Sequence, residues 1–161
     1  MAKGLYTPGE FRDNCGFGLI AHCGGEASHD LLMTSIEALT RMTHRGGIAA
    51  DGKTGDGCGL LFQMPDVFMR RAAVDACGVE LGDLFAVGMI FLSPDDSTDL
   101  RAIKVIENVL KSRRLSVAGW RDVPIDPTNL GPIARSNMPL FKQVFVEPQN
   151  QDKERFDNEL F

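Results

Sequence analysis

The sequence predicts a mixed domain in which helices and strands alternate, and two observations support this prediction. Short apolar runs bounded by glycine, proline or polar residues are typical of buried strands. Longer stretches with apolar residues three and four positions apart are typical of amphipathic helices. The two patterns follow one another through all 161 residues, with no internal repeat and no linker that would separate two domains. With 43% hydrophobic residues, the chain has enough apolar material for one core, so we expect one domain or part of one.

In the first half of the chain we expect two strands and two helices in alternation. Their ranges are residues 16–22 (strand), 28–45 (helix), 60–63 (strand) and 65–78 (helix). Both strands are short apolar runs that follow glycines. The first helix has Ser28 as its N-cap and ends before the glycine pair at 46–47, whereas the second begins at Pro65 and ends at Gly78.

The second half continues the alternation. Strands are predicted at residues 85–92, 115–123 and 141–146, and helices at 97–110 and near the carboxyl end of 149–161. The helix at 97–110 has the clearest period in the chain, because Leu100, Ile103, Ile106 and Leu110 lie on one face. Residues 124–139 are rich in proline and glycine, so we expect an irregular connection there.

The charge and hydropathy of the chain exclude several classes of partner. A formal net charge of −5 argues against binding to a phosphate backbone, so we expect no nucleic acid partner. The first ten residues lack the apolar core of a secretory signal, and no later stretch is long and apolar enough to span a bilayer. We therefore expect a cytoplasmic protein without a membrane partner.

The four cysteines are Cys15, Cys23, Cys58 and Cys77. A chain of this size without a signal peptide does not need disulfides, so free thiols are expected. No pair has the Cys-x-x-Cys or His-x-x-x-His spacing of a metal site, and we expect no bound metal. Taken alone, a cysteine beside glycines is more often a small core residue than a nucleophile, and we keep this interpretation for Cys23, Cys58 and Cys77.

Five short blocks, taken in their order and spacing, resemble the glutaminase domain of the glutamate synthase large subunit, a class II glutamine amidotransferase of the N-terminal-nucleophile family. The resemblance covers about residues 13–146. The blocks are Cys15-Gly16-x-Gly18, His44-Arg45-Gly46, Thr54-Gly55-Asp56-Gly57-Cys58-Gly59, Ala86-Val87-Gly88-Met89 and Gly119-Trp120-Arg121-x-Val123-Pro124.

Each block alone has a plainer interpretation. The second reads as the basic end of a helix. The third suggests a phosphate loop, although Lys53 precedes its glycines and no Gly-Lys-Ser/Thr ending follows. Trp120 reads as a core or edge aromatic. The order and spacing of all five blocks together favour the amidotransferase.

The resemblance implies an α+β fold, the four-layered αββα sandwich of N-terminal-nucleophile hydrolases, of which this chain would supply the first portion. Residues 1–14 would be a leader that is removed, and residues 15–161 the amino-terminal part of the amidotransferase domain. Cys15 would be the nucleophile, and its own α-amino group would serve as the base. Arg45 would order the site. The residues implied to line the site at backbone level are Gly46, Thr54, Gly55, Asp56 and Gly57.

The implied reaction is the hydrolysis of glutamine to glutamate and ammonia, which would pass to 2-oxoglutarate for glutamate biosynthesis and ammonia assimilation. Enzymes of this family use FMN, an iron–sulfur cluster and reducing equivalents from NAD(P)H or ferredoxin. The resemblance assigns these cofactors to parts of the enzyme outside this sequence, so no cofactor is expected in it. The implied partners are glutamine, the remaining synthase domains and a small electron-transferring subunit.

The sequence departs from the family pattern in two ways. The family's oxyanion hole includes an Asn-Gly pair, which this sequence lacks, and a further arginine that binds the substrate carboxylate lies beyond the blocks found here. Losing one oxyanion donor typically costs two to three orders of magnitude in rate, so we expect the 161 residues alone to be inactive or nearly so. The alternatives are a phosphoribosyl pyrophosphate amidotransferase, an asparagine synthetase, or a non-catalytic domain with structural cysteines.

Overall fold

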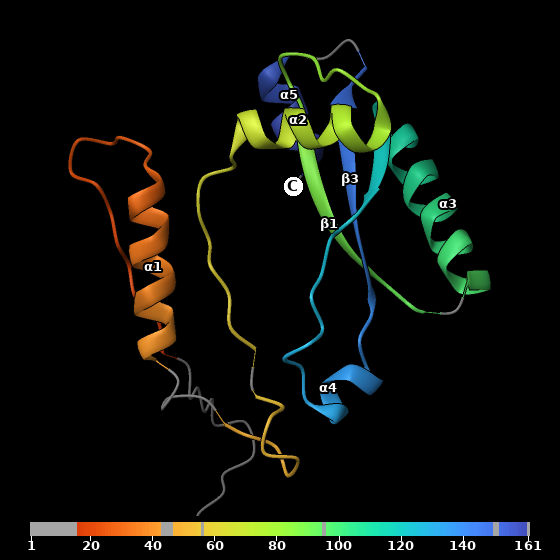
Figure 1. The fold of residues 1–161 in the computed structure, drawn as a ribbon. Helices are drawn as coiled ribbons and strands as arrows, with labels where there is room; N and C mark the ends of the chain where they lie inside the picture. The colour runs from red at the N-terminus through yellow and green to blue at the C-terminus, as the bar shows by residue number, and fades with distance from the viewer. Residues whose placement is uncertain (1–15, 43–46, 56, 95, 150–151, 161) are drawn as a thin grey trace, which may run out of the picture. The chain divides into compact units, whose positions relative to one another are not determined.

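The computed structural model describes residues 16–42, 47–55, 57–94, 96–149 and 152–160 (Figure 1). The chain divides into two compact units, Met1–Phe62 and Gln63–Phe161. The first unit contains one helix, α1 (His29–Arg41), among its described residues. The elements of the second unit are α2 (Asp66–Cys77), β1 (Ala86–Leu92), α3 (Asp96–Ser112), β2 (Leu115–Asp122), α4 (Pro132–Ser136), β3 (Leu140–Pro148) and α5 (Lys153–Leu160).

Helix α1 forms where its capping residue predicts it. The hydroxyl of Ser28 accepts a hydrogen bond from the backbone N–H of Leu31 at 3.1 Å, which satisfies one of the donors that the first helical turn leaves without a partner. The N–H of Met42 bonds to the carbonyl of Leu39 and closes the last turn. The predicted helix is therefore confirmed at its start, and it ends at Arg41, earlier than the glycine pair.

The two strands predicted in the first half of the chain are wrong. Residues 16–22 and 60–63 have no strand pairing, and Phe17 is 93% exposed. The sequence pattern failed here because a strand requires a second strand to bond its N–H and C=O groups. Among the described residues, neither run finds such a partner.

A three-stranded antiparallel sheet in the order β1-β3-β2 forms the centre of the second unit. The register aligns Val87 of β1 with Phe145 of β3, and Arg121 of β2 with Gln143 of β3. A bulge shifts the pairing between Val117 and Gly119. All three predicted strands of this half are confirmed, and β3, the last along the chain, lies in the middle.

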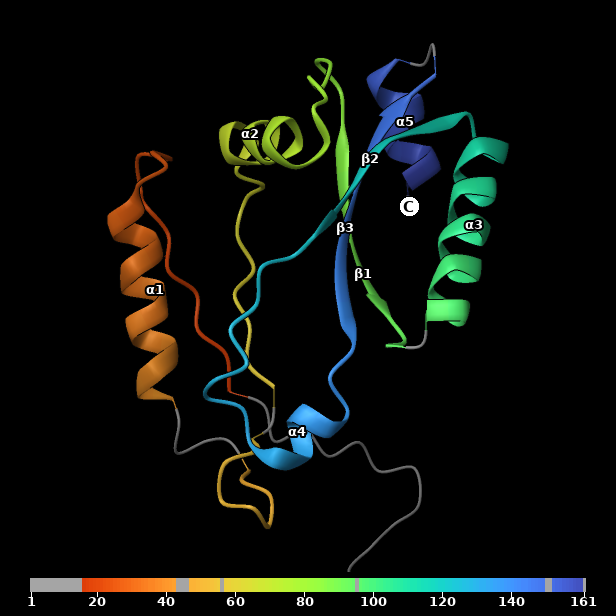
Figure 2. The ribbon, with the colours of Figure 1, turned by 45° about the vertical axis from the view of Figure 1, so that its right-hand side comes forward.

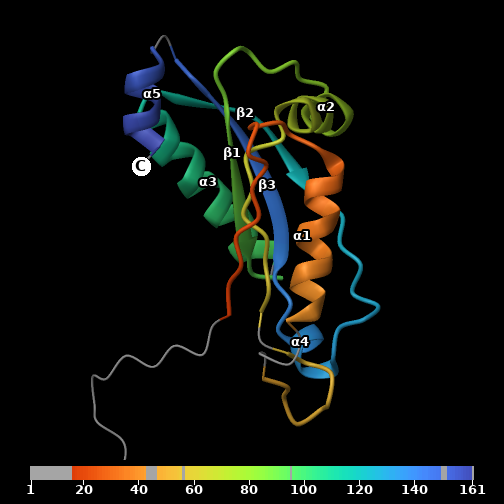
Figure 3. The same cartoon turned by 90° about the vertical axis from the view of Figure 1, so that its left-hand side faces the viewer.

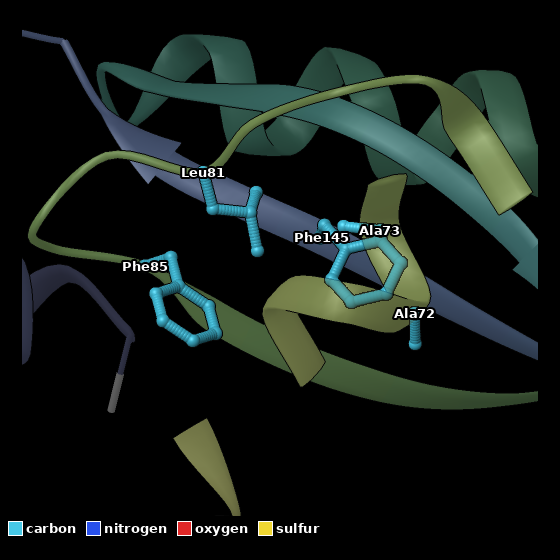
Figure 4. Close-up of a cluster of buried hydrophobic side chains, with 5 residues drawn as sticks. All are labelled: Ala72, Ala73, Leu81, Phe85 and Phe145. Carbon is cyan, nitrogen blue, oxygen red and sulfur yellow. The ribbon is translucent and has the colours of Figure 1, made fainter. Parts of the chain in front are cut away.

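Helices cover both faces of this sheet, with α2 on one side and α3 and α5 on the other (Figures 2 and 3). Because side chains alternate along a strand, Phe145 points toward α2, while Val144 and Val146 point toward α3 and α5. Figure 4 shows the first cluster, in which Phe145 is fully buried against Ala72 and Ala73 of α2. This antiparallel sheet with helices confirms the α+β class.

Helix α2 is confirmed at both of its predicted ends. Gly78 ends the helix in the left-handed conformation, with φ of 68°, and its N–H bonds to the carbonyls of Ala73 and Val74. Arg70 ties the helix to the connection that follows it, since its Nη1 donates to the carbonyl oxygens of Leu81 at 2.7 Å and Gly82 at 3.0 Å.

The remaining helices agree with the sequence in most respects. Helices α3 and α5 form where they are predicted, and Phe156 of α5 is buried against the sheet. The predicted connection at 124–139 also contains the short helix α4, which the sequence analysis missed. Pro132 lies in the first turn of α4, where a backbone N–H would have no partner within the helix, so the N–H that proline lacks is not needed.

Candidate functional site

The predicted site residues divide into two groups. Cys15, Arg45, Gly46 and Asp56 lie outside the described residues. Thr54, Gly55 and Gly57 lie within them, on the glycine-rich segment of the first unit. The described geometry of the site is therefore that of this segment and its neighbours in the chain.

Residues 48–55 form a small hairpin. Ile48 and Gly55 make an antiparallel bridge, and the N–H of Ala49 donates to the carbonyl of Thr54 at 2.7 Å. At the turn, the N–H of Gly52 bonds to the carbonyl of Ala49 at 3.0 Å, and φ of Gly52 is +68°. A residue with a side chain rarely adopts this conformation, so the glycine is required by the turn itself.

The carboxylate of Asp51 holds the hairpin together. One oxygen, Oδ1, accepts from the backbone N–H groups of Lys53 at 3.0 Å and Thr54 at 2.8 Å. The other, Oδ2, accepts from the hydroxyl of Thr54 at 2.6 Å. The sequence analysis did not single out Asp51 as a functional residue. An aspartate before a glycine and two residues before a backbone donor is, however, a recognised signal for this kind of turn.

The hairpin brings the predicted loop next to the chain that follows Arg45. A methyl group at the Cα of Gly55 would lie 3.6 Å from the carbonyl oxygen of Gly47, two residues after Arg45. A methyl group at the Cα of Gly57 would have none of the described atoms within 4 Å. The described residues therefore leave open space beside the backbone at Gly57.

The segment after Cys15 ends in a tight turn. The carbonyl oxygen of His22 accepts a hydrogen bond from the N–H of Gly25 at 3.0 Å, and Nδ1 of the His22 side chain accepts one from the N–H of Glu26 at 3.2 Å. Cys23 lies in this turn and is exposed, as is Cys58 in the glycine-rich segment. The expectation that both are packing residues is therefore wrong, because the described residues do not enclose them.

Cys77 matches the packing interpretation. It lies at the end of α2, is half-buried, and donates a hydrogen bond from Sγ to the carbonyl of Trp120 at 3.2 Å. A methyl group at Gly119 would lie only 2.7 Å from this sulfur. A methyl group at Gly88 would likewise lie 2.9 Å from Cγ1 of Val144. The glycines of the fourth and fifth blocks thus allow close packing in the second unit.

Two side chains of the fifth block lie on opposite faces of the sheet. Trp120 packs on the α3 side and donates from Nε1 to Oε1 of Glu107 at 2.9 Å. Arg121 lies on the α2 side, where its Nη1 donates to Oε1 of the buried Gln143 at 2.6 Å. Together with Phe68 and Arg71 of α2, Arg121 lines a shallow hollow of about 310 Å³.

Two features of the described part of the chain bear on cofactors and membranes. Within it, no three histidine, cysteine, aspartate or glutamate side chains converge, so it offers no ligand set for a metal ion or a cluster. None of the helices described is long and apolar enough to cross a membrane.

The family model for class-II glutamine amidotransferases matches residues 15–161. The NADPH glutamate synthase large chain of Bacillus subtilis is 34% identical over 99% of this chain and 11% of its own length. The NADH glutamate synthase of Saccharomyces cerevisiae is 35% identical, over 98% of this chain and 8% of its own length. A ferredoxin-dependent glutamate synthase of Pyropia yezoensis is 38% identical, over 93% of this chain and 10% of its own length. The chain thus spans about a tenth of the length of these curated relatives.

Proposed function

The chain belongs to the class-II glutamine amidotransferases, and we propose that it hydrolyses the side-chain amide of glutamine with Cys15 as the nucleophile. The single observation that carries this proposal is the family match, which begins at residue 15 and runs to residue 161. A glutaminase of this kind needs a free amino group on its nucleophile. We therefore propose that residues 1–14 are removed as a leader.

The proposed reaction begins with proton transfer inside Cys15. A thiol has a pKa of about 8.5 and is mostly protonated at neutral pH. An α-amino group has a similar pKa, about 7.7–8.0, so its neutral form can accept the thiol proton. The thiolate attacks the amide carbon, a C–S bond forms, and the C–N bond breaks as the α-ammonium group returns its proton to the leaving nitrogen. Water then cleaves the thioester, which releases glutamate and restores the thiol.

The residues around the nucleophile have supporting roles in this proposal. Arg45 orders the nucleophile and its surroundings. The backbone of Gly46 and of the segment from Thr54 through Gly55 and Asp56 to Gly57 lines the glutamine site. The hairpin supports this grouping, because it holds Gly55 against the backbone of Gly47, which follows Arg45 and Gly46 in the chain.

We propose further that the ammonia is consumed in glutamate synthesis. The matched relatives are NADPH-, NADH- and ferredoxin-dependent glutamate synthases, which supports a synthase as the acceptor system. In that system, further domains would bind 2-oxoglutarate, FMN and an iron–sulfur cluster, and a small subunit would supply electrons. These cofactors and partners, and a cytoplasmic location, stay predictions for the protein that contains this chain.

The experiment that tests the proposal replaces Cys15 in the full-length protein. Cys15→Ala and Cys15→Ser should abolish glutamine-dependent activity and leave ammonia-dependent synthesis intact, because the thiol serves only ammonia release. Cys23→Ala is the matched control, since Cys23 is an exposed thiol eight residues further along the chain. A diazoketone analogue of glutamine should label Cys15, and sequencing of the active protein should begin at Cys15. Glutaminase activity in Cys15→Ala would contradict the proposal and would favour the alternative in which the cysteines are structural.

A further inference from the structure

We infer that Asp51 is a positioning residue of the glutaminase site, which holds the segment beginning at Thr54 in the conformation that binds glutamine. This inference rests on the proposed function, which puts that segment beside the substrate amide. Asp51 itself would not contact glutamine. It would act through the backbone and side chain of Thr54.

The carboxylate of Asp51 bonds to Thr54 at two points. Asp51 accepts from both the N–H and the hydroxyl of Thr54, at 2.8 and 2.6 Å, and from the N–H of Lys53 at 3.0 Å. Hydrogen bonds to an ionised acceptor are roughly twice as strong as bonds between neutral groups. The Asp51 carboxylate therefore orients both the side chain and the peptide N–H of Thr54.

The carbonyl side of Thr54 is also held by hydrogen bonds. Its carbonyl accepts from the N–H of Ala49 at 2.7 Å, and Gly55 bridges to Ile48. Hydrogen bonds thus hold Thr54 from both sides, and the described residues leave open space beside the backbone at Gly57. A ligand that bonds to this backbone meets groups that are already ordered, so it loses less free energy in ordering them.

A positioning role and a merely stabilising role of Asp51 predict different effects of its loss. If Asp51 only stabilises the hairpin, its loss lowers the melting temperature and leaves the KM of the folded enzyme unchanged. If Asp51 positions the segment, its loss raises the KM for glutamine, because the substrate must then order the segment on binding. Ammonia-dependent synthesis needs no glutamine site, so it should not change in either case.

The test uses Asp51→Ala and Asp51→Asn in the full-length protein. Asp51→Ala removes the bonds that the carboxylate accepts from Lys53 and Thr54. We expect the KM for glutamine to rise about tenfold with kcat within about twofold, the size of effect that loss of about 1.4 kcal/mol produces. Asp51→Asn should recover most of this loss, because the amide oxygen can accept both N–H groups and the amide nitrogen can donate to the Thr54 hydroxyl. The rate of Cys15 labelling by the diazoketone analogue should follow the same order.

Asp126→Ala provides the matched control. Its Oδ1 accepts from the N–H of Thr128 at 2.9 Å and from the Thr128 hydroxyl, the same chemistry in a loop of the other unit. This variant should leave the KM for glutamine unchanged.

The outcomes distinguish the inference from the proposed function. An unchanged KM in Asp51→Ala, together with loss of glutamine-dependent activity in Cys15→Ala, overturns the positioning role and leaves the glutaminase assignment intact. Activity that survives Cys15→Ala overturns the assignment itself and, with it, this inference. If Asp51→Ala does not fold, Thr54→Val decides, since it keeps the shape of the side chain and the bond from the residue 54 N–H to Asp51, but removes the bond from the hydroxyl to Oδ2 of Asp51. A raised KM there supports the inference, and an unchanged KM contradicts it.

Discussion

Replacing Gly119 by alanine tests the packing of β2 against α2. The new methyl carbon would lie 2.7 Å from Sγ and 2.8 Å from Cβ of Cys77, closer than the 3.0 Å that real Cβ atoms essentially never cross. Gly119 is not among the described glycines with positive φ, so the backbone itself can accept an alanine. The cost is therefore steric, and β2 and the end of α2 must move apart.

The expected destabilisation follows from two opposing effects. Overpacking a well-packed core costs about 1–3 kcal/mol. Alanine also lowers the conformational entropy of the unfolded chain, which raises the unfolding free energy by about 0.4–1 kcal/mol. The net loss of unfolding free energy should lie between about 0 and 2.6 kcal/mol, with a middle value of about 1.3 kcal/mol. For a chain of this length, the middle value lowers Tm by about 3–5 °C.

Urea unfolding followed by fluorescence measures this loss directly. Trp120 is the single tryptophan of the chain, and its neighbour in sequence is the substituted residue. The matched variants are Gly119→Ala in combination with Cys77→Ala and with Cys77→Gly. Because Cβ of Cys77 is itself within 2.8 Å, Cys77→Ala should relieve only part of the clash, whereas Cys77→Gly should relieve it fully. An equal cost of Gly119→Ala in all three backgrounds would refute the reasoning.

Two further predictions concern single side chains of the second unit. Arg70→Ala should lower the unfolding free energy, because the guanidinium of Arg70 donates to two carbonyls and to Asp66. Arg71→Ala should lower it much less, because that side chain is 82% exposed and its ion pair with Asp75 lies on the surface. Equal effects in urea unfolding would contradict the assigned role of the Arg70 contacts. The pKa of Asp126 is lowered from 3.8 by hydrogen bonds from the hydroxyl and then the N–H of Thr128. A lowered folded pKa contributes stability that is present above the ordinary carboxyl pKa and is lost as the pH falls through the folded value. An NMR titration of the Asp126 carboxyl should show a midpoint below 3.8 that rises in Thr128→Val; a midpoint at or above 3.8 in the unmodified protein would show that the bonds do not form.

The site shows where sequence reasoning reached its limit. The resemblance assigned roles to Cys15 and Arg45, and these assignments stay predictions because both residues lie outside the described ranges. Asp51 could have been found from the Asx-turn pattern, since the bonds that it accepts from Lys53 and Thr54 join residues within three positions of one another. The exposure of Cys23 and Cys58 could not have been found this way, because burial depends on which distant segments cover a residue.

The sequence by itself determined the four longer helices, α1, α2, α3 and α5, and the family. Ser28 and Gly78 mark helix ends that the structure confirms, because a helix bonds each N–H to a carbonyl only four residues away and its caps act over the same short range. Only the tertiary structure decided the sheet. The apolar run at 16–22 looks like a strand and is not one, whereas 141–146 is one and lies between two partners. The pairs Val87–Phe145 and Arg121–Gln143 join residues far apart in the chain, so strand order and the need for glycine at position 119 depend on contacts that no local pattern contains.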